Sequence, residues 1–366
     1  MSGKAENSFH PGELWLDNNG VHINAHGGGI LFHQNRYYWF GEHKIEGEAG
    51  NAAHVGVHVY SSHDLHHWVD EGIALPVSDD PKSDIVRGCI IERPKVVYNK
   101  RTNKFVMWFH LEPKSVGGSY AGSLSGVAMA DNVTGPFHFL QSFRPNAGVW
   151  PENIRAESRC PLSTGELAIV NALELPGGPL PYYPKELLYR RDFANGQMAR
   201  DMTLFVDEDA RAYHVYASEA NGTLHISLLS DDYLGPAGKF IRILPGRFNE
   251  APAMFKWSGR YFIITSDCTG WTPNPARLLA ADSILGIWEE LGNPCNGTGE
   301  QITNTFNSQP TFVLPVQGRP DAFIFMADRW NPANAIDGRY VWLPIEFHHG
   351  VPMMSWHDEW DLSFFD

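Results

Sequence analysis

The chain contains little cysteine for its length, and its cysteines are scattered. Four occur in 366 residues, Cys89, Cys160, Cys268 and Cys295, and no two have CxxC spacing. So few cysteines exclude a disulfide framework in a chain of this size. We therefore expect unpaired buried thiols, with a bridge between Cys268 and Cys295 as the alternative.

Long apolar runs are also missing. No segment approaches about 18 consecutive apolar residues, so we expect no membrane insertion. The N-terminal stretch MSGKAENSFHPGELW lacks the apolar core of a signal peptide. We expect a soluble protein that is cytoplasmic as written, or secreted or periplasmic if an export signal has been removed.

Positive charge is scarce. The chain has 28 Lys and Arg against 42 Asp and Glu, a formal net charge of -14. Nucleic acids and anionic membranes select basic surfaces, so neither is an expected partner. A neutral ligand such as an oligosaccharide or polysaccharide fits better, and the oligomeric state stays open.

Glycine, proline and aromatic residues are abundant. There are 35 Gly and 25 Pro, and aromatic residues reach 13% with 12 Trp. This composition favours many short strands joined by turns over long helices. We expect an all-β protein with a sizeable core.

One pattern recurs five times: a polar or glycine-rich start, an apolar run, a hairpin turn and an aromatic or β-branched strand. The five segments are HGGGILFHQNRYYWFGE from His26, ERPKVVYNKRTNKFVMWFH from Glu92, RDMTLFVDEDARAYHVYAS from Arg200, EAPAMFKWSGRYFIITS from Glu250 and SQPTFVLPVQGRPDAFIFMAD from Ser308. Three repeats then supply a second strand pair, in VHVYSSHDLHHW, GVAMADNVTGPFHFL and RLLAADSILGIWEEL.

Four strands per unit around an axis is the architecture of a β-propeller. Five repeats predict a single five-bladed propeller domain over residues 1–366. Residues 149–199 do not carry the repeat and include WPENIRAESRCPL, ELAIVNALEL and PGGPLPYYP. We interpret them as an elaborated loop over one face, because a separate unit of about 50 residues would be marginally stable.

Polar residues near the start of each repeat are candidates for a shared active site. The innermost strands of a propeller converge on its axis, so these residues would face one cavity. They are His26, Glu92, Asp201, Glu250 and Gln309. Crowded carboxyl groups with separated pKa values suit glycoside hydrolysis. Aromatic side chains could cover the faces of a sugar, and the candidates are Trp39, Tyr120, Trp271 and Trp330.

Each candidate also has an ordinary structural explanation. Glu92 and Asp201 could form surface ion pairs with the arginines beside them. Glu250 could cap a turn, and Gln309 could be a structural hydrogen-bonding residue. The HGGG run could suggest an esterase oxyanion hole, but no GxSxG motif follows. The histidines show no HExxH or comparable spacing, so we assign no metal ligands.

Several of these segments resemble one known enzyme family. They are similar to motifs of glycoside hydrolase family 43, in its branch of exo-β-1,3-galactanases (galactan 1,3-β-galactosidases): INAHGGGILFHQNRYYWFGEHK, IERPKVVYN, RDMTLFVDEDARAYHVYAS, NEAPAMFK, SDCTGW and NSQPTF. The similarity runs from about residue 15 to the C-terminus and lapses across 149–199. It implies a five-bladed propeller with an axial pocket and an inverting, single-displacement reaction.

The resemblance also implies roles for individual residues. Glu250 matches the general acid, and Asp201 matches the aspartate that modulates its pKa. The usual family base is an Asp before the first strand of blade one. That place is occupied here by His26-Gly27-Gly28, without a carboxylate. The galactanase branch shares this loss.

That branch is thought to use a Gln of the fifth blade instead, as an imidic acid tautomer in one view, and this Gln corresponds to Gln309. Glu92 matches a further Glu that is important in the branch. The expected substrate-binding residues, which hold the terminal galactose with the axial His26, are Glu42, Tyr120, Thr269 and Trp271.

We therefore expect an exo-acting, inverting glycoside hydrolase that releases terminal galactose from β-1,3-galactan or arabinogalactan-type glycans. Glu250 is the expected acid, Asp201 tunes it, and Gln309 with Glu92 positions the water. The alternatives are an α-L-arabinofuranosidase or β-D-galactofuranosidase on the same fold, and a non-catalytic carbohydrate-binding propeller. No cofactor is required, and a structural calcium ion is left open, because some members of the wider family bind one.

Overall fold

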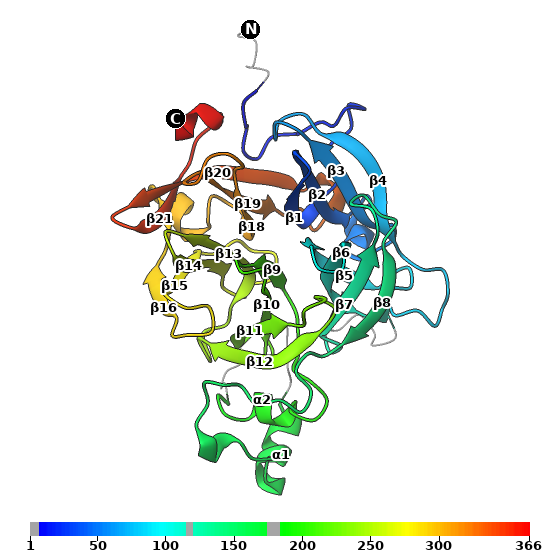
Figure 1. The fold of residues 1–366 in the computed structure, drawn as a ribbon, viewed down its shortest axis with the longest axis vertical. Helices are drawn as coiled ribbons and strands as arrows, with labels where there is room; N and C mark the ends of the chain where they lie inside the picture. Colours follow the sequence, from blue (N-terminus) through cyan, green and yellow to red (C-terminus); the bar gives the residue numbers. More distant parts are fainter. Residues whose placement is uncertain (1–6, 115–119, 174–183) are drawn as a thin grey trace.

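Five β-sheets surround a central axis in the computed structural model, which describes residues 7–114, 120–173 and 184–366 (Figure 1). In four of the sheets the first strand lies nearest the axis and the others follow outward in chain order; the fifth sheet does the same from β18 to β21 and adds the short β17 at its outer edge. The prediction of an all-β, five-bladed propeller is confirmed. Among these described residues, no helix is long and apolar enough to cross a membrane.

Each blade is a run of consecutive antiparallel strands. Blade one contains β1 (His26–His33), β2 (Arg36–His43), β3 (Gly56–Ser62) and β4 (Val69–Pro76). Blade two contains β5 (Ile90–Asn99), β6 (Lys104–Glu112), β7 (Leu124–Ala130) and β8 (His138–Phe143). Blade three contains β9 (Met202–Val206), β10 (Ala212–Ser218), β11 (Thr223–Leu229) and β12 (Pro236–Ile243).

The remaining two blades follow the same order. Blade four contains β13 (Glu250–Trp257), β14 (Arg260–Ser266), β15 (Arg277–Ala281) and β16 (Glu289–Gly292). Blade five contains β18 (Gln309–Pro315), β19 (Phe323–Arg329), β20 (Arg339–His348) and β21 (Val351–Ser355). The short β17 (Cys295–Asn296), which leaves blade four, pairs in parallel with β21. Short helical turns occupy the connections: η1 (Glu48–Asn51), α3 (Glu300–Thr303), η4 (Ala335–Asp337) and η5 (Leu362–Phe365).

The two inner strands of each blade correspond to one sequence repeat, and the turns between them explain why. Gln34 and Asn35 both adopt positive φ, which is the conformation of a tight two-residue hairpin. The aromatic residues Trp68, Phe137 and Trp288 precede β4, β8 and β16 and are buried. The outer strand pairs of blades three and five were not recognised in the sequence.

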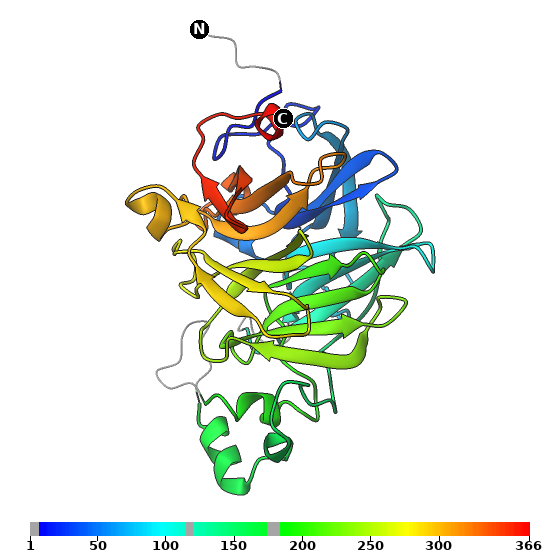
Figure 2. The same cartoon turned by 60° about the vertical axis from the view of Figure 1, so that its left-hand side comes forward.

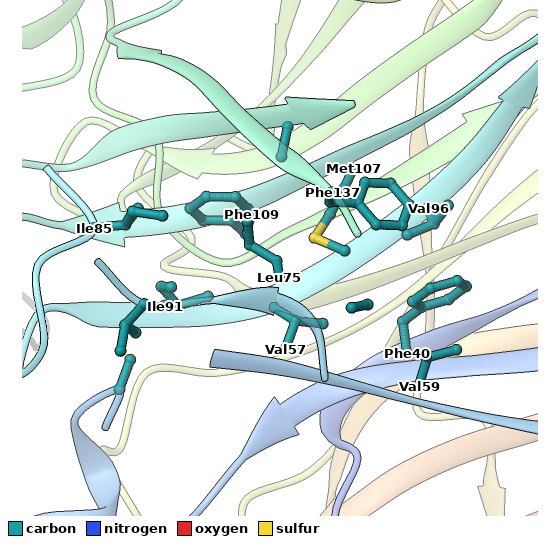
Figure 3. Close-up of a cluster of buried hydrophobic side chains, with 14 of the residues drawn as sticks. Phe40, Val57, Val59, Leu75, Ile85, Ile91, Val96, Met107, Phe109 and Phe137 are labelled. Carbon is teal, nitrogen blue, oxygen red and sulfur yellow. The ribbon is translucent and has the colours of Figure 1, made fainter. Parts of the chain in front are cut away.

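Five apolar clusters form the core, one between each pair of neighbouring blades. Figure 3 shows the cluster between blades one and two, where Phe40 and Val59 face Val96 and Met107. Burial of such side chains contributes about 2 kcal/mol each. Between blades five and one, Trp68 packs edge to face with Trp39 and Trp342, which contact each other at a tilt, and the three rings join the first blade to the last.

The described residues of the interval, 149–173 and 184–199, lie mainly beside the outer edge of blade three (Figures 1 and 2). They include η3 (Ala156–Ser158), α1 (Thr164–Asn171) and α2 (Leu188–Arg191). The backbone N–H of Glu152 donates to the carbonyl of Phe240 on β12, at 2.8 Å. The described part of the segment therefore follows the free edge of β12, and its interpretation as an elaborated loop stays a prediction. Most of PGGPLPYYP lies outside the described residues.

All four cysteines are free thiols. Cys89, Cys268 and Cys295 are buried as expected, whereas Cys160 is exposed. The alternative of a Cys268–Cys295 bridge is therefore wrong. Cys268 lies at the axial cavity, and Cys295 belongs to the apolar cluster between blades four and five.

Candidate active site

A cavity of about 460 Å³ opens at the end of the axis where the innermost strands begin. All five blades supply residues to it. The lining residues are Glu42, Lys44, Glu92, Arg93, His110, Tyr120, Arg200, Asp201, Asn221, Glu250, Cys268, Thr269, Gly270, Trp271, Gln309 and Trp330. The structure thus brings together nine of the eleven residues that the sequence nominated, the exceptions being His26 and Trp39.

A local irregularity of the innermost strands directs their first residues toward the axis. The strand register shifts after His26, Glu92 and Glu250, as it does in a β-bulge. The residue after each one, Gly27, Arg93 or Ala251, adopts φ between 53° and 60°. Two of these three are not glycine, and such residues rarely adopt this conformation. The bulges turn the preceding side chains away from the ladder.

The glycines of HGGG leave room for a carboxylate. A Cβ on Gly27 would lie 2.2 Å from Glu42 Oε1, and one on Gly28 would lie 1.7 Å from the carbonyl oxygen of Phe40. The Glu42 carboxylate, which comes from β2, therefore occupies space beside blade one that a side chain at position 27 would fill. It pairs with Lys44 Nζ at 2.6 Å and accepts a hydrogen bond from the Arg93 backbone N–H at 3.0 Å.

Glu250 is a carboxyl group that holds its proton. Burial, together with the neighbouring charge of Asp201, raises the pKa of Glu250 to about 8. Asn221 Nδ2 donates to Glu250 Oε1 at 2.7 Å. Asp201 accepts from Arg93 Nη2 at 2.9 Å and from the Ala251 backbone N–H at 3.1 Å. The cavity thus contains a protonated acid beside a carboxylate that is fixed by an arginine.

Glu92 has the opposite character. Burial raises its pKa, but the hydrogen bond and positive charge of His110 outweigh burial and lower the pKa of Glu92 to about 2. His110 Nδ1 lies 2.9 Å from Glu92 Oε2, and the Tyr120 hydroxyl donates to Glu92 Oε1 at 2.8 Å. Glu92 is therefore an ionised hydrogen-bond acceptor, and the surface ion pair with Arg93 does not form.

Gln309 is held by three neighbours. Its Oε1 accepts from Arg93 Nη2 at 2.6 Å and from Trp330 Nε1 at 2.9 Å, and its Nε2 donates to Ser266 Oγ at 3.1 Å. Arginine and tryptophan side chains are obligate donors. They favour the ordinary amide at this position, because an imidic acid would add a further hydrogen at Oε1.

Aromatic and hydroxyl groups form the rim. Trp271 is 44% exposed and packs edge to face with Trp330 at a centroid distance of 5.9 Å. Thr269 is exposed beside it and accepts from Asn274 Nδ2 at 2.7 Å. Two flat apolar surfaces therefore stand next to the carboxyl groups, which suits a sugar ring.

Two nominated residues lie elsewhere. His26 is fully buried and does not line the cavity: its ring stacks on Tyr340 and its Nδ1 lies 3.8 Å from Asp328 Oδ1. Its absence from the cavity lining gives no support to the expected contact with substrate. Trp39 is buried in the apolar cluster between blades five and one, because it faces away from the axis on β2.

Solved structures show which proteins this propeller resembles. A family 43 β-1,3-galactosidase, solved with galactodeoxynojirimycin, is 48% identical to the chain. The match covers 97% of this chain and 100% of that one, with a TM-score of 0.88. The chain belongs to glycoside hydrolase family 43. The expected family and its β-1,3-galactosidase branch are thereby confirmed.

Two exo-β-1,3-galactanases are more distant relatives of this family 43 chain. The protein from Clostridium thermocellum is 31% identical over 97% of this chain and 66% of its own, with a TM-score of 0.76. A variant from Phanerochaete chrysosporium, solved with β-1,3-galactotriose, is 29% identical over 97% of this chain and 68% of its own, with a TM-score of 0.75. No protein-family profile and no curated protein matches the chain.

The wider family 43 includes calcium-binding members, and one group of the described residues is close enough to hold a metal ion. One atom each of Glu92, His110 and Asp201 lies within 4.8 Å of the others. The group fits a cation poorly, because both His110 nitrogens face carboxylates at 2.9 Å and Asp201 is paired with Arg93. Binding of a structural calcium ion by this chain stays a prediction.

Sequence reasoning missed the basic residues of this family 43 site. Arg93 is buried and contacts Asp201, Gln309 and the ring of Trp330, 5.3 Å from its centroid. The side chains of Lys44 and His110 are also buried at the cavity. One indication was available in the sequence: KFVMWFHLE is an apolar strand that ends with two polar residues two positions apart, His110 and Glu112.

Proposed function

We propose that this chain is an exo-acting, inverting β-1,3-galactosidase that releases terminal galactose from β-1,3-galactan and arabinogalactan-type glycans. The proposal depends on one observation above all, the protonated Glu250 beside Asp201, which is paired with Arg93, in a cavity with aromatic walls. The 48% identity to a β-1,3-galactosidase over its whole chain supports the choice of sugar and linkage.

In this reaction Glu250 gives its proton to the glycosidic oxygen while the bond between that oxygen and the anomeric carbon breaks. Asp201 raises the pKa of Glu250 and so keeps the acid loaded near neutral pH. A water molecule attacks the anomeric carbon from the opposite face of the ring: its oxygen bonds to that carbon, and its surplus proton passes to solvent water, from which Glu250 is protonated again. The aglycone leaves as an alcohol, and galactose forms with inverted configuration.

We assign Gln309 to the orientation of the attacking water. Arg93 and Trp330 hold its Oε1, so the amide is fixed at the edge of the cavity. Glu92 is a weak candidate for the base, because a carboxylate with a pKa of about 2 has little affinity for a proton. Its expected part is to accept hydrogen bonds from sugar hydroxyls.

The shape of the cavity supports attack at chain ends. A second cavity of about 660 Å³ lies further along the innermost strands, lined by residues such as Lys95, Leu204 and Phe312. Among the described residues none lines both cavities. The buried Lys95 lies between them, with Nζ donating to the Gly27 carbonyl at 2.9 Å. A blind pocket accepts the terminal sugar of a chain and excludes an internal one.

Sugar analysis after incubation with β-1,3-galactan, 4-nitrophenyl α-L-arabinofuranoside and 4-nitrophenyl β-D-galactofuranoside tests the proposal. We expect free galactose from β-1,3-galactan and none from the Glu250→Gln preparation used as the control. Release of sugar from a furanoside alone would overturn the proposal in favour of a furanosidase. Galactan binding without any turnover would indicate a non-catalytic carbohydrate-binding propeller.

A further inference from the structure

An imidazole at the cavity wall lies between two carboxylates. His110 Nδ1 is 2.9 Å from Glu92 Oε2, and His110 Nε2 is 2.9 Å from Glu112 Oε1. A neutral imidazole has one N–H, and ionised carboxylates only accept hydrogen bonds. Two such contacts therefore require N–H groups at both ring nitrogens. The geometry is that of an imidazolium held at both ends.

The β-sheet of blade two produces this row of charges. His110 and Glu112 are two residues apart on β6, so their side chains point to the same face. Glu92 on β5 is the register partner of His110. The row thus starts at the cavity with Glu92 and ends inside the blade at Glu112, whose side chain is 0% exposed.

The inner end of the row is anchored by its own contacts. Glu112 Oε1 accepts the backbone N–H of Ser123 at 2.8 Å. The Ser123 hydroxyl oxygen accepts Arg200 Nε at 3.1 Å, and Arg200 Nη2 donates to the Tyr120 carbonyl at 2.7 Å. Arg200 is buried and brings a positive charge near Glu112. It offsets the net negative charge of two carboxylates and one imidazolium.

At the outer end, one lone pair on each Glu92 oxygen is already used. His110 takes Oε2 and the Tyr120 hydroxyl takes Oε1. Glu92 lines the cavity and its side chain is 15% exposed there. A carboxylate can accept about four hydrogen bonds, so about two remain for a ligand. Two neighbouring hydroxyl groups of a sugar have the matching chemistry.

We propose that His110 and Glu112 are positioning residues of the active site. Glu112 keeps His110 as an imidazolium, and His110 keeps Glu92 as an oriented carboxylate that accepts hydroxyl groups of the bound galactose. This inference rests on the proposed function, because it concerns how the same cavity holds its sugar. The other titratable and charged groups that face this row are Lys44, Arg93, Tyr120, Arg144, Arg200 and Asp201.

The energetics separate this role from that of a stabilising ion pair. A buried group of charges is often less stable than apolar side chains of the same size, because desolvation is costly. Burial lowers the pKa of His110, but its hydrogen bonds to Glu112 and Glu92 outweigh burial and raise the pKa to about 9. Stability alone gives no reason for such an arrangement, whereas a fixed acceptor at the cavity does.

The charge on His110 can be measured directly by ¹⁵N NMR of the imidazole nitrogens. The His110→Asn variant assigns the signals, and a variant of the exposed surface residue, His138→Asn, is the matched control. We expect both His110 nitrogens to be protonated from about pH 5.5 to about pH 8. A single neutral tautomer at pH 7 would overturn the proposal, whether or not the enzyme cleaves galactan.

Galactose binding measured between about pH 4.5 and about pH 8 tests the role in the site. We expect nearly constant affinity in the wild type. Without His110, Glu92 can take up a proton in this range. The affinity of the His110→Asn variant for galactose should therefore weaken about tenfold as the pH falls, which is the effect of about one unit in the pKa of Glu92. Glu112→Gln should weaken binding as the pH rises, because His110 then loses its proton.

Equal weakening at every pH in both variants would show a merely structural role and would overturn the proposal. If His110→Asn does not fold, the isosteric Glu112→Gln variant provides the test alone. A wild-type protein that binds no galactose would instead contradict the proposed function, and the NMR result would still report the charge of His110.

Discussion

Glu250 and Glu92 are the same amino acid at equivalent points of two blades, and their chemistry is opposite. Each is followed by a residue with positive φ, Ala251 or Arg93, and by a shift of strand register. Yet the pKa of Glu250 is raised to about 8, whereas that of Glu92 is lowered to about 2. The backbone repeat places both carboxyl groups at the cavity without deciding their protonation.

The neighbours decide it. Glu250 is buried and faces the negative charge of Asp201, with a neutral amide at Oε1. Glu92 is equally withdrawn from solvent, but it faces the cation of His110 and the hydroxyl of Tyr120. A buried carboxyl group is neutral or ionised according to the sign of the charge beside it. Substitution of these neighbours should therefore change the pKa of Glu250 or of Glu92.

Removal of the acid should have the largest effect. We expect Glu250→Gln to lower kcat on β-1,3-galactan by about a thousandfold or more, because a general acid contributes about 10²- to 10⁴-fold. Galactose binding should remain, since the amide fills the same space. Initial rates and binding isotherms measure the two quantities. Turnover near that of the wild type would exclude Glu250 as the acid.

Substitution of the residue that orients the attacking water should have the next largest effect. We expect Gln309→Ala to lower kcat by about a hundredfold, because the variant loses the group that orients the water. Glu92→Gln should mainly raise KM, since Glu92 is assigned to hydroxyl groups of the sugar. Steady-state kinetics of both variants separate the roles. A fully active Gln309→Ala variant would contradict the assignment.

The raised pKa of Glu250 also predicts how kcat depends on pH above neutrality. In the wild type kcat should fall as the pH rises through about 8, where Glu250 loses its proton. Asp201→Asn removes the negative charge that helps to raise the pKa of Glu250, so the fall should move to lower pH. If one pKa unit is lost, we expect kcat to drop about twofold at pH 7 and nearly tenfold at about pH 9. An unchanged profile would show that burial alone holds the proton.

Stability should respond to His110 with a defined pH dependence. The lowered pKa of Glu92 stabilises the fold above about pH 4.5, the ordinary pKa of a glutamate. This stabilisation is lost as the pH falls toward 2. The raised pKa of His110 stabilises the fold below about 6.5, and this is lost as the pH rises through about 9. His110→Asn should therefore lower the free energy of unfolding most between about pH 4.5 and about pH 6.5, by about 3 kcal/mol. Denaturant unfolding measures this loss. A loss of unfolding free energy that is the same at every pH would contradict this dependence of stability on protonation.

The smallest expected effect concerns the rim. Trp271→Ala should raise KM for galactan about threefold to tenfold with little change in kcat, because it removes one aromatic surface and no charged group. The carboxyl pair and its pH profile should be unaffected. A large loss of kcat with an unchanged KM would place Trp271 closer to the reacting atoms than its exposed position indicates.

The sequence by itself determined the architecture. Alternating strand composition and turns such as HQNR and WSG repeat five times, and only a closed ring of sheets buries every apolar face of such a chain. It also brought Glu92, Asp201, Glu250 and Gln309 to one axis, because equivalent positions of a repeat occupy equivalent places. The outer strands of blades three and five were missed, since they lack the repeat pattern.

Only the tertiary structure decided how these residues are protonated and with which neighbours they pair. Arg93 is adjacent to Glu92 in the chain, yet it pairs with Asp201 of the neighbouring blade three. The HGGG segment lacks a carboxylate, and the one beside it arrives from Glu42 on the neighbouring strand, in space that Gly27 leaves free. Protonation and pairing depend on through-space neighbours and burial, which are set by how blades meet and not by the order of residues within one blade.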